Sequence, residues 1–451
     1  MRRTRRMRVW WGKRRRGRNR RPFHIPHSRH LNVWQASLVM VLAFPLVALF
    51  GMLPFVFLGH VTPVHAFFDS MAAVTTTGLT CVPAEGSGFP PLLIFWHSLL
   101  GWGGGFLFLV LLVTVLPQVS GNFGLTLSAR QSIRFIPTYR RMAQSMRQVG
   151  GLYIALTLAA AAAFLWTGLS PFQALNRAML TISTTGDGGF GAFLDDENPW
   201  LELAAGVVML VAGGNLLLYW RSWHLRSLRL LLSDMELKRY LVLLLGAGLL
   251  LSWTLWHTGT EGGAAAALRH GFFQAVSFLT TTGYVSADTS HFPDFARYIL
   301  FLLACSGACI GAPSGGLKIM RLIVLSRMSR LELQRTLHPH MVVSVKVDGL
   351  VVEMRIVSRI LALFFLYIGM LAVGALVLSL AGLDALQAIG LSAGCLTSTG
   401  STAQLFGVYD MGALPAWAQL FSCLWMMLGR IELFSFFVLL AFARSKQRKH
   451  W

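Results

Sequence analysis

Charged residues are scarce in this sequence of 451 residues: Asp, Glu, Lys and Arg make up 13% of it, against about 25% in soluble domains. Acidic residues are the scarcer kind, with 18 Asp and Glu against 39 Lys and Arg. The five cysteines are odd in number and scattered, so we expect no disulfide framework. Hydrophobic residues make up 55% of the chain, and its mean hydropathy is +0.60. The composition excludes an ordinary soluble domain and favours a membrane protein.

Apolar runs that approach or exceed the length needed to cross a bilayer, about 20 residues, recur along the chain. The eight candidate spans are Trp34–Leu58, Leu92–Leu116, Gly151–Gly168, Leu201–Trp220, Tyr240–Trp256, Tyr298–Leu325, Ile360–Ala381 and Trp417–Phe442. They predict a helical protein that crosses the membrane many times. The first run is too long for a cleaved signal peptide, and no small-residue cleavage site follows it.

Basic residues gather in alternate connections between these spans. Residues 1–30 hold 13 Arg or Lys and no acid, and more lie in 118–148, 221–239, 318–359 and the tail from Arg444. Because Lys and Arg accumulate in cytoplasmic loops, both termini are predicted to be cytoplasmic. The net charge of +21 raises nucleic-acid binding as an alternative, but a basic arm beside a membrane span is better explained by contact with anionic lipid.

A short polar pattern, Ser/Thr-Ser/Thr-Thr-Gly, occurs four times, with its glycines 108, 97 and 117 residues apart. Such near-regular recurrence indicates an internal repeat. We call the four copies the polar turns: Thr75–Gly78, Ser183–Gly186, Thr280–Gly283 and Thr397–Gly400. Each follows a segment too short to cross the membrane, and these predict re-entrant half-helices: Ala66–Val74, Pro171–Ile182, Ala265–Leu279 and Ala385–Leu396. A small residue stands eight positions before each glycine: Ser70, Ala178, Ala275 and Ser392.

The repeat predicts the fold class, an all-α integral membrane protein. Four pseudo-symmetric repeats of span, re-entrant half-helix and span would form a potassium-channel-like pore in one chain. The predicted repeats are 34–117, 150–220, 240–325 and 356–442. Cytoplasmic loops at 118–149, 221–239 and 326–355 separate them, between a basic arm at 1–33 and a basic tail at 443–451.

Four equivalent turns around one axis can aim backbone carbonyls at it, and a ring of carbonyls can replace the hydration shell of a potassium ion. Glycine allows the positive φ that such a turn needs, and the partly negative C-terminal ends of the half-helices favour a cation. The predicted potassium-binding residues are Thr76, Thr77, Gly78, Thr184, Thr185, Gly186, Thr281, Thr282, Gly283, Ser398, Thr399 and Gly400. The alternative is that the turns are ordinary helix caps in another kind of transporter.

The stretch Ser306–Gly316, "SGACIGAPSGG", interrupts the third inward span with four glycines and a proline. Glycine costs about 1 kcal/mol and proline about 3 kcal/mol relative to alanine inside a helix, so a continuous helix is not expected. We expect a loop beneath the turns that can block the pore, with Lys318 and Arg321 at its cytoplasmic end for a partner to act on. A static kink is the alternative. The predicted gate residues are Gly307, Gly311, Pro313, Gly315, Gly316 and Arg430.

Two charged residues stand out. Arg430 is a basic residue inside a predicted span, where a charge costs about 2.5–3.5 kcal/mol. It predicts an electrostatic barrier below the polar turns; the alternative is a buried ion pair, with Glu432 or with a residue of another span. Asp187 directly follows the second turn and is predicted to concentrate cations at the outer mouth.

Other motifs predict no chemistry. Gly186–Gly191 fits G-x-G-x-x-G, but no strand is predicted before it and no helix directly after it, so a dinucleotide site is not indicated. Cys305 and Cys309 lack His or carboxylate companions for a metal, and His24, His27 and His30 lie in the basic arm. We therefore expect no enzyme and no resident cofactor, only potassium as the transported ligand.

The chain resembles the bacterial TrkH/KtrB superfamily of potassium-translocating subunits from about Trp34 onward. Besides the polar turns, the resemblance rests on "GWGGGFLFLVLLVTVLP", "CSGACIGAPSGGLKIMRL", "HPHMVVSVKVDGLVV" and "WMMLGRIELFSFFVLL". It implies potassium uptake across the bacterial cytoplasmic membrane, a homodimer, and a cytoplasmic ring of nucleotide-binding RCK-type regulatory domains. It also implies a gating role for residues 306–316.

Two features depart from the superfamily's pattern. The chain has only its basic arm where TrkH-type members carry two further spans, and Asp187 stands where glycine or an apolar residue is expected. The rival function is a secondary transporter that couples potassium or another solute to protons or sodium. A membrane scaffold without transport would leave the four polar turns unexplained.

Overall fold

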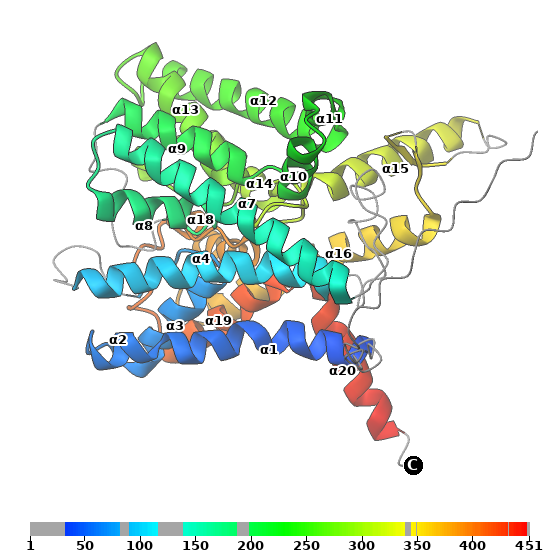
Figure 1. The fold of residues 1–451 in the computed structure, drawn as a ribbon, viewed down its shortest axis with the longest axis horizontal. Coiled ribbons are helices and arrows are strands. Elements are labelled where there is room, and N and C mark those ends of the chain that lie inside the picture. Colours follow the sequence, from blue (N-terminus) through cyan, green and yellow to red (C-terminus); the bar gives the residue numbers. More distant parts are fainter. Residues whose placement is uncertain are drawn as a thin grey trace, which may run out of the picture. The chain divides into compact units, whose positions relative to one another are not determined.

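The computed structural model describes residues 32–81, 90–115, 139–186, 198–338, 344–348, 350–431 and 433–448. The first two repeats contain α1 (Val33–Gly51), α2 (Leu53–Phe57), α3 (Pro63–Val74), α4 (Pro91–Thr114), α7 (Tyr139–Trp166), α8 (Pro171–Ile182), α9 (Pro199–Ala212) and α10 (Leu216–His224). The third contains α12 (Met235–His257), α13 (Ala264–Leu279), η2 (Thr289–His291), α14 (Asp294–Ser306) and α15 (Ile319–Leu337). The fourth contains α16 (Met354–Ser379), α17 (Ala385–Thr397), α18 (Ser401–Gln404), α19 (Ala416–Arg430) and α20 (Leu433–Arg448). Figure 1 shows the bundle that these helices make.

The four half-helices are α3, α8, α13 and α17; the first three end directly before a polar turn, and α17 ends at Thr397, the first residue of the fourth turn. They have 12 to 16 residues, so at 1.5 Å per residue they are shorter than a bilayer core of about 30 Å. Proline starts α3 and α8, where its missing N–H removes no helical hydrogen bond. The small residues expected on these helices are all fully buried: Ser70, Ala178, Ala275 and Ser392.

The repeats pack in a closed cycle. The inward helix of each repeat packs against the half-helix of the next: α4 on α8, α9 on α13, and α14 on α17. In the fourth repeat, α19 packs on α3 of the first and closes the cycle. One hydrophobic core joins repeats one and four and another joins repeats two and three. A sequence of four similar units therefore builds one ring.

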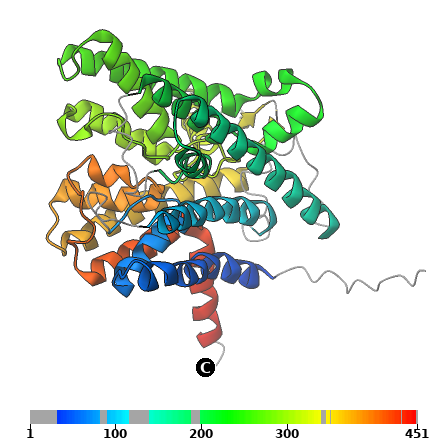
Figure 2. The ribbon, with the colours of Figure 1, turned by 60° about the vertical axis from the view of Figure 1, so that its left-hand side comes forward.

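Two predicted spans are bent rather than continuous. The segment predicted as a span at Leu201–Trp220 is bent, since α9 and α10 meet at 85°. The side chain of Asn215 accepts hydrogen bonds from the amides of Leu217 and Leu218 and so starts a new helix after Gly213 and Gly214. The segment predicted as a span at Trp417–Phe442 is likewise bent, because α19 and α20 meet at 105°. Figure 2 shows α20, in red, leaving the bundle after this bend.

The third inward span is interrupted, as its glycines and proline predict. Helix α14 ends at Ser306, and α15 begins at Ile319 and runs on to Leu337. The connection predicted as a loop at 326–355 therefore includes the end of α15 and a hairpin of β1 (Lys346–Val347) and β2 (Leu350–Val351). The loop predicted at 221–239 similarly contains α11 (Leu228–Ser233). Among the described residues, five helices are long and apolar enough to cross a membrane, or seven if each bent pair forms one span.

Candidate functional site

The first three polar turns end their half-helices in the same way. In the first turn the amides of Thr76 and Thr77 donate to the carbonyls of Ala73 and Ala72, at 2.8 Å each, which is the Schellman pattern. The second residue of every turn has a left-handed backbone, although none of them is glycine. These residues are Thr76, Thr184, Thr281 and Ser398, with φ between 53° and 58°. A β-branched residue is rarely found there, so the turns hold local strain at a repeated position.

The glycines of the turns contact the next turn in chain order. A methyl group on Gly78 would lie 2.1 Å from the carbonyl oxygen of Thr185, and one on Gly186 would lie 2.3 Å from that of Thr282. Real carbon atoms do not come so close, so only glycine fits. One on Gly400 would lie 2.7 Å from the carbonyl oxygen of Thr77 in the first turn. The four turns thus form a closed ring.

The side chains of the turns are buried polar groups, some without partners. In the first three turns the hydroxyls of the first and third residues pair with each other, at 2.7 to 2.9 Å: Thr75 with Thr77, Ser183 with Thr185, and Thr280 with Thr282. Among the described residues, nothing bonds the buried hydroxyls of Thr76, Thr184 and Ser398. Buried hydroxyls are usually satisfied, so oxygen atoms without partners at a ring suit a cation that they can coordinate.

The interrupted segment of the third repeat, residues 307–318, lies against this ring; we call it the inserted loop. The amide of Gly315 donates to the hydroxyl of Thr281 at 2.8 Å. A methyl group on Gly315 would lie 1.9 Å from the carbonyl oxygen of Thr397 and 3.0 Å from Cβ of Ser398. The inserted loop therefore contacts both the third and the fourth turn.

The other side of the inserted loop is bonded to the second repeat and to α12. The amide of Cys309 donates to the carbonyl of Gly213, and the amide of Leu216 donates to that of Gly311. The amide of Ile310 donates to the fully buried carboxylate of Glu236 at 2.8 Å. The inserted loop is thus held against the bend between α9 and α10.

Lys318 does not extend to the cytoplasmic end of the loop as expected; it is 5% exposed. Its ammonium group turns back and donates to the carbonyls of Ala312 and Ser314 and to the Ser314 hydroxyl. Arg321 is also buried, at 6% exposed. The Lys318 ammonium group thus bonds to the loop itself, because the turns of the loop leave several carbonyls without helical partners.

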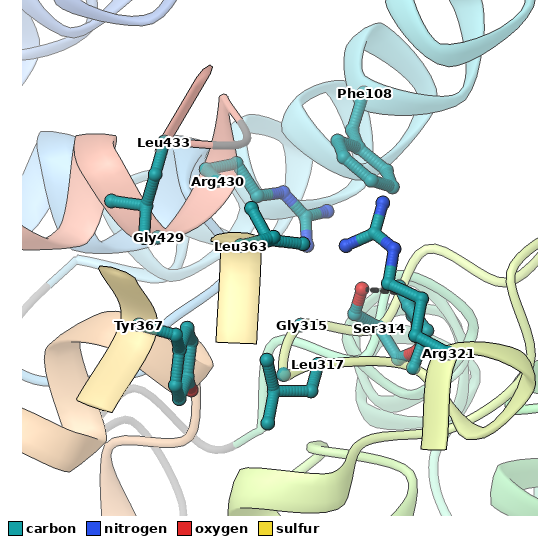
Figure 3. Close-up of a pocket in the computed structure, with 12 residues that line it drawn as sticks. Phe108, Ser314, Gly315, Leu317, Arg321, Leu363, Tyr367, Gly429, Arg430 and Leu433 are labelled. Atoms are coloured by element: carbon teal, nitrogen blue, oxygen red, sulfur yellow. Dashed lines mark hydrogen bonds between the residues drawn. The ribbon is translucent and has the colours of Figure 1, made fainter. Parts of the chain in front are cut away.

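Arg430 lies across a small cavity from the inserted loop (Figure 3). The cavity measures about 30 Å³ and is lined by both. The Arg430 side chain is 1% exposed, and its guanidinium lies 4.1 Å from the ring centroid of Phe108 on α4. None of its nitrogens has a hydrogen-bond partner among the described residues, and Glu432 lies outside them. The cation–π contact with Phe108 is a partner that the sequence did not reveal.

The remaining predicted residues divide as follows. Asp187 and the rest of the G-x-G-x-x-G stretch after Gly186 lie outside the described residues, as does the basic arm. Cys305 and Cys309 belong to no group of potential metal ligands in the described part of the chain. Gly307, Gly311, Gly315 and Gly316 all lie in the inserted loop, and Gly307 and Gly316 have positive φ.

The geometry can be compared with known proteins. The family model TrkH, described as cation transport protein, matches residues 52–450. The chain is 27% identical over 444 residues to the Trk system potassium uptake protein TrkH of Salmonella typhimurium, covering 96% of this chain and 88% of that protein. It is 31% identical over 430 residues to the Trk system potassium uptake protein TrkI of Halomonas elongata, covering 93% and 85%. Its fold resembles the crystal structure of the potassium transporter TrkH from Vibrio parahaemolyticus, with a TM-score of 0.83, 26% identity, and coverage of 92% and 86%.

Proposed function

The chain belongs to the TrkH family of cation transport proteins, and we propose that its four polar turns form the selectivity filter of a potassium uptake pore. It is a multi-pass membrane protein, and potassium uptake across the membrane is its function. The observation that supports the filter most is the closed ring in which Gly78, Gly186 and Gly400 each lie against a threonine carbonyl of the next turn. Carbonyl oxygens around one axis can replace the water shell of potassium.

The driving force on the ion is the membrane potential, worth about 2.3 kcal/mol per charge per 100 mV. The chain performs no covalent chemistry in this proposal. Reconstitution of the protein in liposomes tests it. Potassium influx should follow an imposed potential when no proton or sodium gradient is present. Influx that appears only with a proton or sodium gradient would instead favour the rival, a coupled secondary transporter.

The inserted loop and Arg430 are proposed as the gate. Gly315 of the loop contacts the third and fourth turns, and Arg430 adds a buried positive charge across the cavity. Deleting Gly311–Gly315 should raise potassium flux and make it independent of any partner. A deleted protein that inserts normally and conducts no faster than its parent would leave the loop as a static kink.

The proposal also covers the membrane, the oligomeric state and the partners of the pore. We place the chain in the bacterial cytoplasmic membrane as a homodimer, with both termini cytoplasmic and the basic arm on anionic lipid. A cytoplasmic ring of RCK-type domains would regulate it. Within the proposed boundaries of the repeats, at 34–117, 150–220, 240–325 and 356–442, each repeat supplies one quarter of the pore. Neither a nucleic acid nor a resident cofactor enters the proposal.

A further inference from the structure

The fourth polar turn departs from the other three. Gly400 has φ −56° and ψ −36°, a right-handed backbone, where Gly78, Gly186 and Gly283 have φ between 72° and 79°. The chain continues directly into α18, a helical turn that begins at Ser401. The hydroxyl pair seen in the first three turns is replaced by a contact from the Thr399 hydroxyl to the carbonyl of Thr397, at 3.4 Å.

This departure commits carbonyl oxygens that the ring would otherwise offer to an ion. The carbonyls of Thr399 and Gly400 accept hydrogen bonds from the amides of Thr402 and Ala403, at 3.0 and 2.9 Å. They belong to the helical turn and no longer face the ring as free acceptors. We call the carbonyls of the third residues of the four turns one outer layer, and those of the four turn glycines the other. The fourth repeat therefore contributes little acceptor capacity to these two outer layers.

The fourth repeat also supplies donors to its two neighbours. The amide of Gly400 donates to the carbonyl of Thr77 in the first turn, at 2.6 Å. The hydroxyl of Ser401 donates to the carbonyl of Gly283 in the third turn. By contrast, no described N–H or O–H group donates to the carbonyls of Thr185 and Thr282. Two of the four oxygens in each outer layer are thus committed, one from the fourth repeat and one from a neighbour.

We propose that the fourth repeat sets ion discrimination by withdrawing carbonyl oxygens from the outer filter, and that Ser401 is the specificity-determining residue that withdraws the Gly283 carbonyl. The inference rests on the proposed filter. Selectivity between potassium and sodium depends on the number and strength of coordinating carbonyl dipoles. With fewer free dipoles, the outer layers bind a cation that keeps part of its water shell. The carbonyls of the first and second residues of the turns must then discriminate between potassium and sodium.

The test measures the potassium-to-sodium flux ratio of the full chain in liposomes. Ser401→Ala removes the donor and frees the Gly283 carbonyl for the ion. The competing hydrogen bond is of ordinary net strength, so the ratio should rise about threefold. Ser401→Thr keeps the hydroxyl and should keep the parent's ratio.

A matched control is Ser392→Ala on α17. Ser392 is fully buried in the same repeat and donates to the carbonyl of Leu371 at 2.9 Å, away from the turns. Its loss should leave the ratio unchanged. Should Ser401→Ala fail to fold, Ser401→Cys, whose thiol is a weak donor, should raise the ratio by a smaller factor.

The outcomes separate two failures. A parent protein that carries no potassium would refute the proposed function itself. A parent that carries potassium, together with Ser401→Ala and Ser401→Cys proteins that keep or lower its ratio, would overturn the role of Ser401 alone.

Discussion

The amide of Gly315 donates a hydrogen bond to the hydroxyl of Thr281, at 2.8 Å, and so joins the inserted loop to the third polar turn. The equivalent hydroxyls of Thr76 and Thr184 have no partner among the described residues. One turn in the ring is therefore bonded to the segment proposed as the gate. Movement of that segment would change the turn's bonding directly.

Replacement of Thr281 by valine, of similar shape, removes this bond. The loop then loses a contact of about 1 kcal/mol, and potassium flux should rise roughly fivefold in liposomes. Thr184→Val is the matched control, since it removes the same turn hydroxyl from a repeat that does not contact Gly315. Equal flux changes in the two variants would show that the loop contact is not the cause.

Gly78 should tolerate alanine least among the turn glycines. Alanine there meets the backbone oxygen of Thr185 at 2.1 Å and adopts a positive φ, which alone costs about 1–2 kcal/mol. At Gly283 the nearest atom is the Ser401 hydroxyl at 2.8 Å, a side chain that can move. Gly78→Ala should therefore lower the potassium-to-sodium flux ratio more than Gly283→Ala does. Gly103 on α4 has no atom within 4 Å of a new methyl group, so a comparable loss in Gly103→Ala would contradict the argument.

Arg430 should oppose the passage of cations. In general, a like charge roughly 7 Å from a cation, at an effective dielectric constant of about 20, opposes it by about 2 kcal/mol. Arg430→Gln should then raise potassium flux by more than tenfold in the reconstituted protein. Phe108→Leu keeps the charge and removes only the ring, so its flux should rise far less. If the two variants conduct alike, Arg430 acts through packing rather than charge.

Lys318 should stabilise the inserted loop. Its replacement by methionine leaves the buried carbonyls of Ala312 and Ser314 without their donor, at a cost of about 1–3 kcal/mol. The thermal unfolding midpoint of the purified protein should fall. The exposed Lys238 on α12 serves as the control, because surface substitutions change stability by about 0.5 kcal/mol or less. A Lys318→Met protein as stable as the Lys238→Met protein would show that the inserted loop does not need the hydrogen bonds of Lys318.

Asp187 stays a prediction from the sequence, since it lies outside the described residues. If its carboxylate concentrates cations at the outer mouth, Asp187→Asn should lower potassium uptake at low salt more than at high salt. The Debye length of about 8 Å at physiological ionic strength sets this dependence. Equal uptake by variant and parent at both salt concentrations would show that the charge has no such role.

Periodicity and length predicted the helices well where one residue type determines a boundary. The half-helix predicted at Pro171–Ile182 is α8 residue for residue, because proline begins it and the serine–threonine turn ends it. The glycines and the proline after Ser306 likewise predicted the break between α14 and α15. These signals are local, and local sequence is sufficient to read them.

The missed features depend on contacts between distant segments. The left-handed backbone of Thr76 contradicts the intrinsic preference of threonine, and it is held by the hydrogen bonds at the end of α3 together with the contacts between the turns. The inward fold of Lys318 needs the carbonyls of Ala312 and Ser314, which the chain presents only once the loop has formed. The stacking of Arg430 on Phe108 joins residues from the first and last repeats, and no spacing in the sequence indicates it.

The helical turn at α18 has a consequence for how such a pore can evolve. A pore assembled from four identical subunits changes its wall at four places with every mutation, so an alteration useful once is imposed four times. Here the four quarters are encoded separately. Gly400 can therefore differ in conformation from Gly78, Gly186 and Gly283, and Ser401 can differ from the residues that follow those glycines. Covalent linkage therefore lets one quarter tune the conduction path while the other three keep its common geometry.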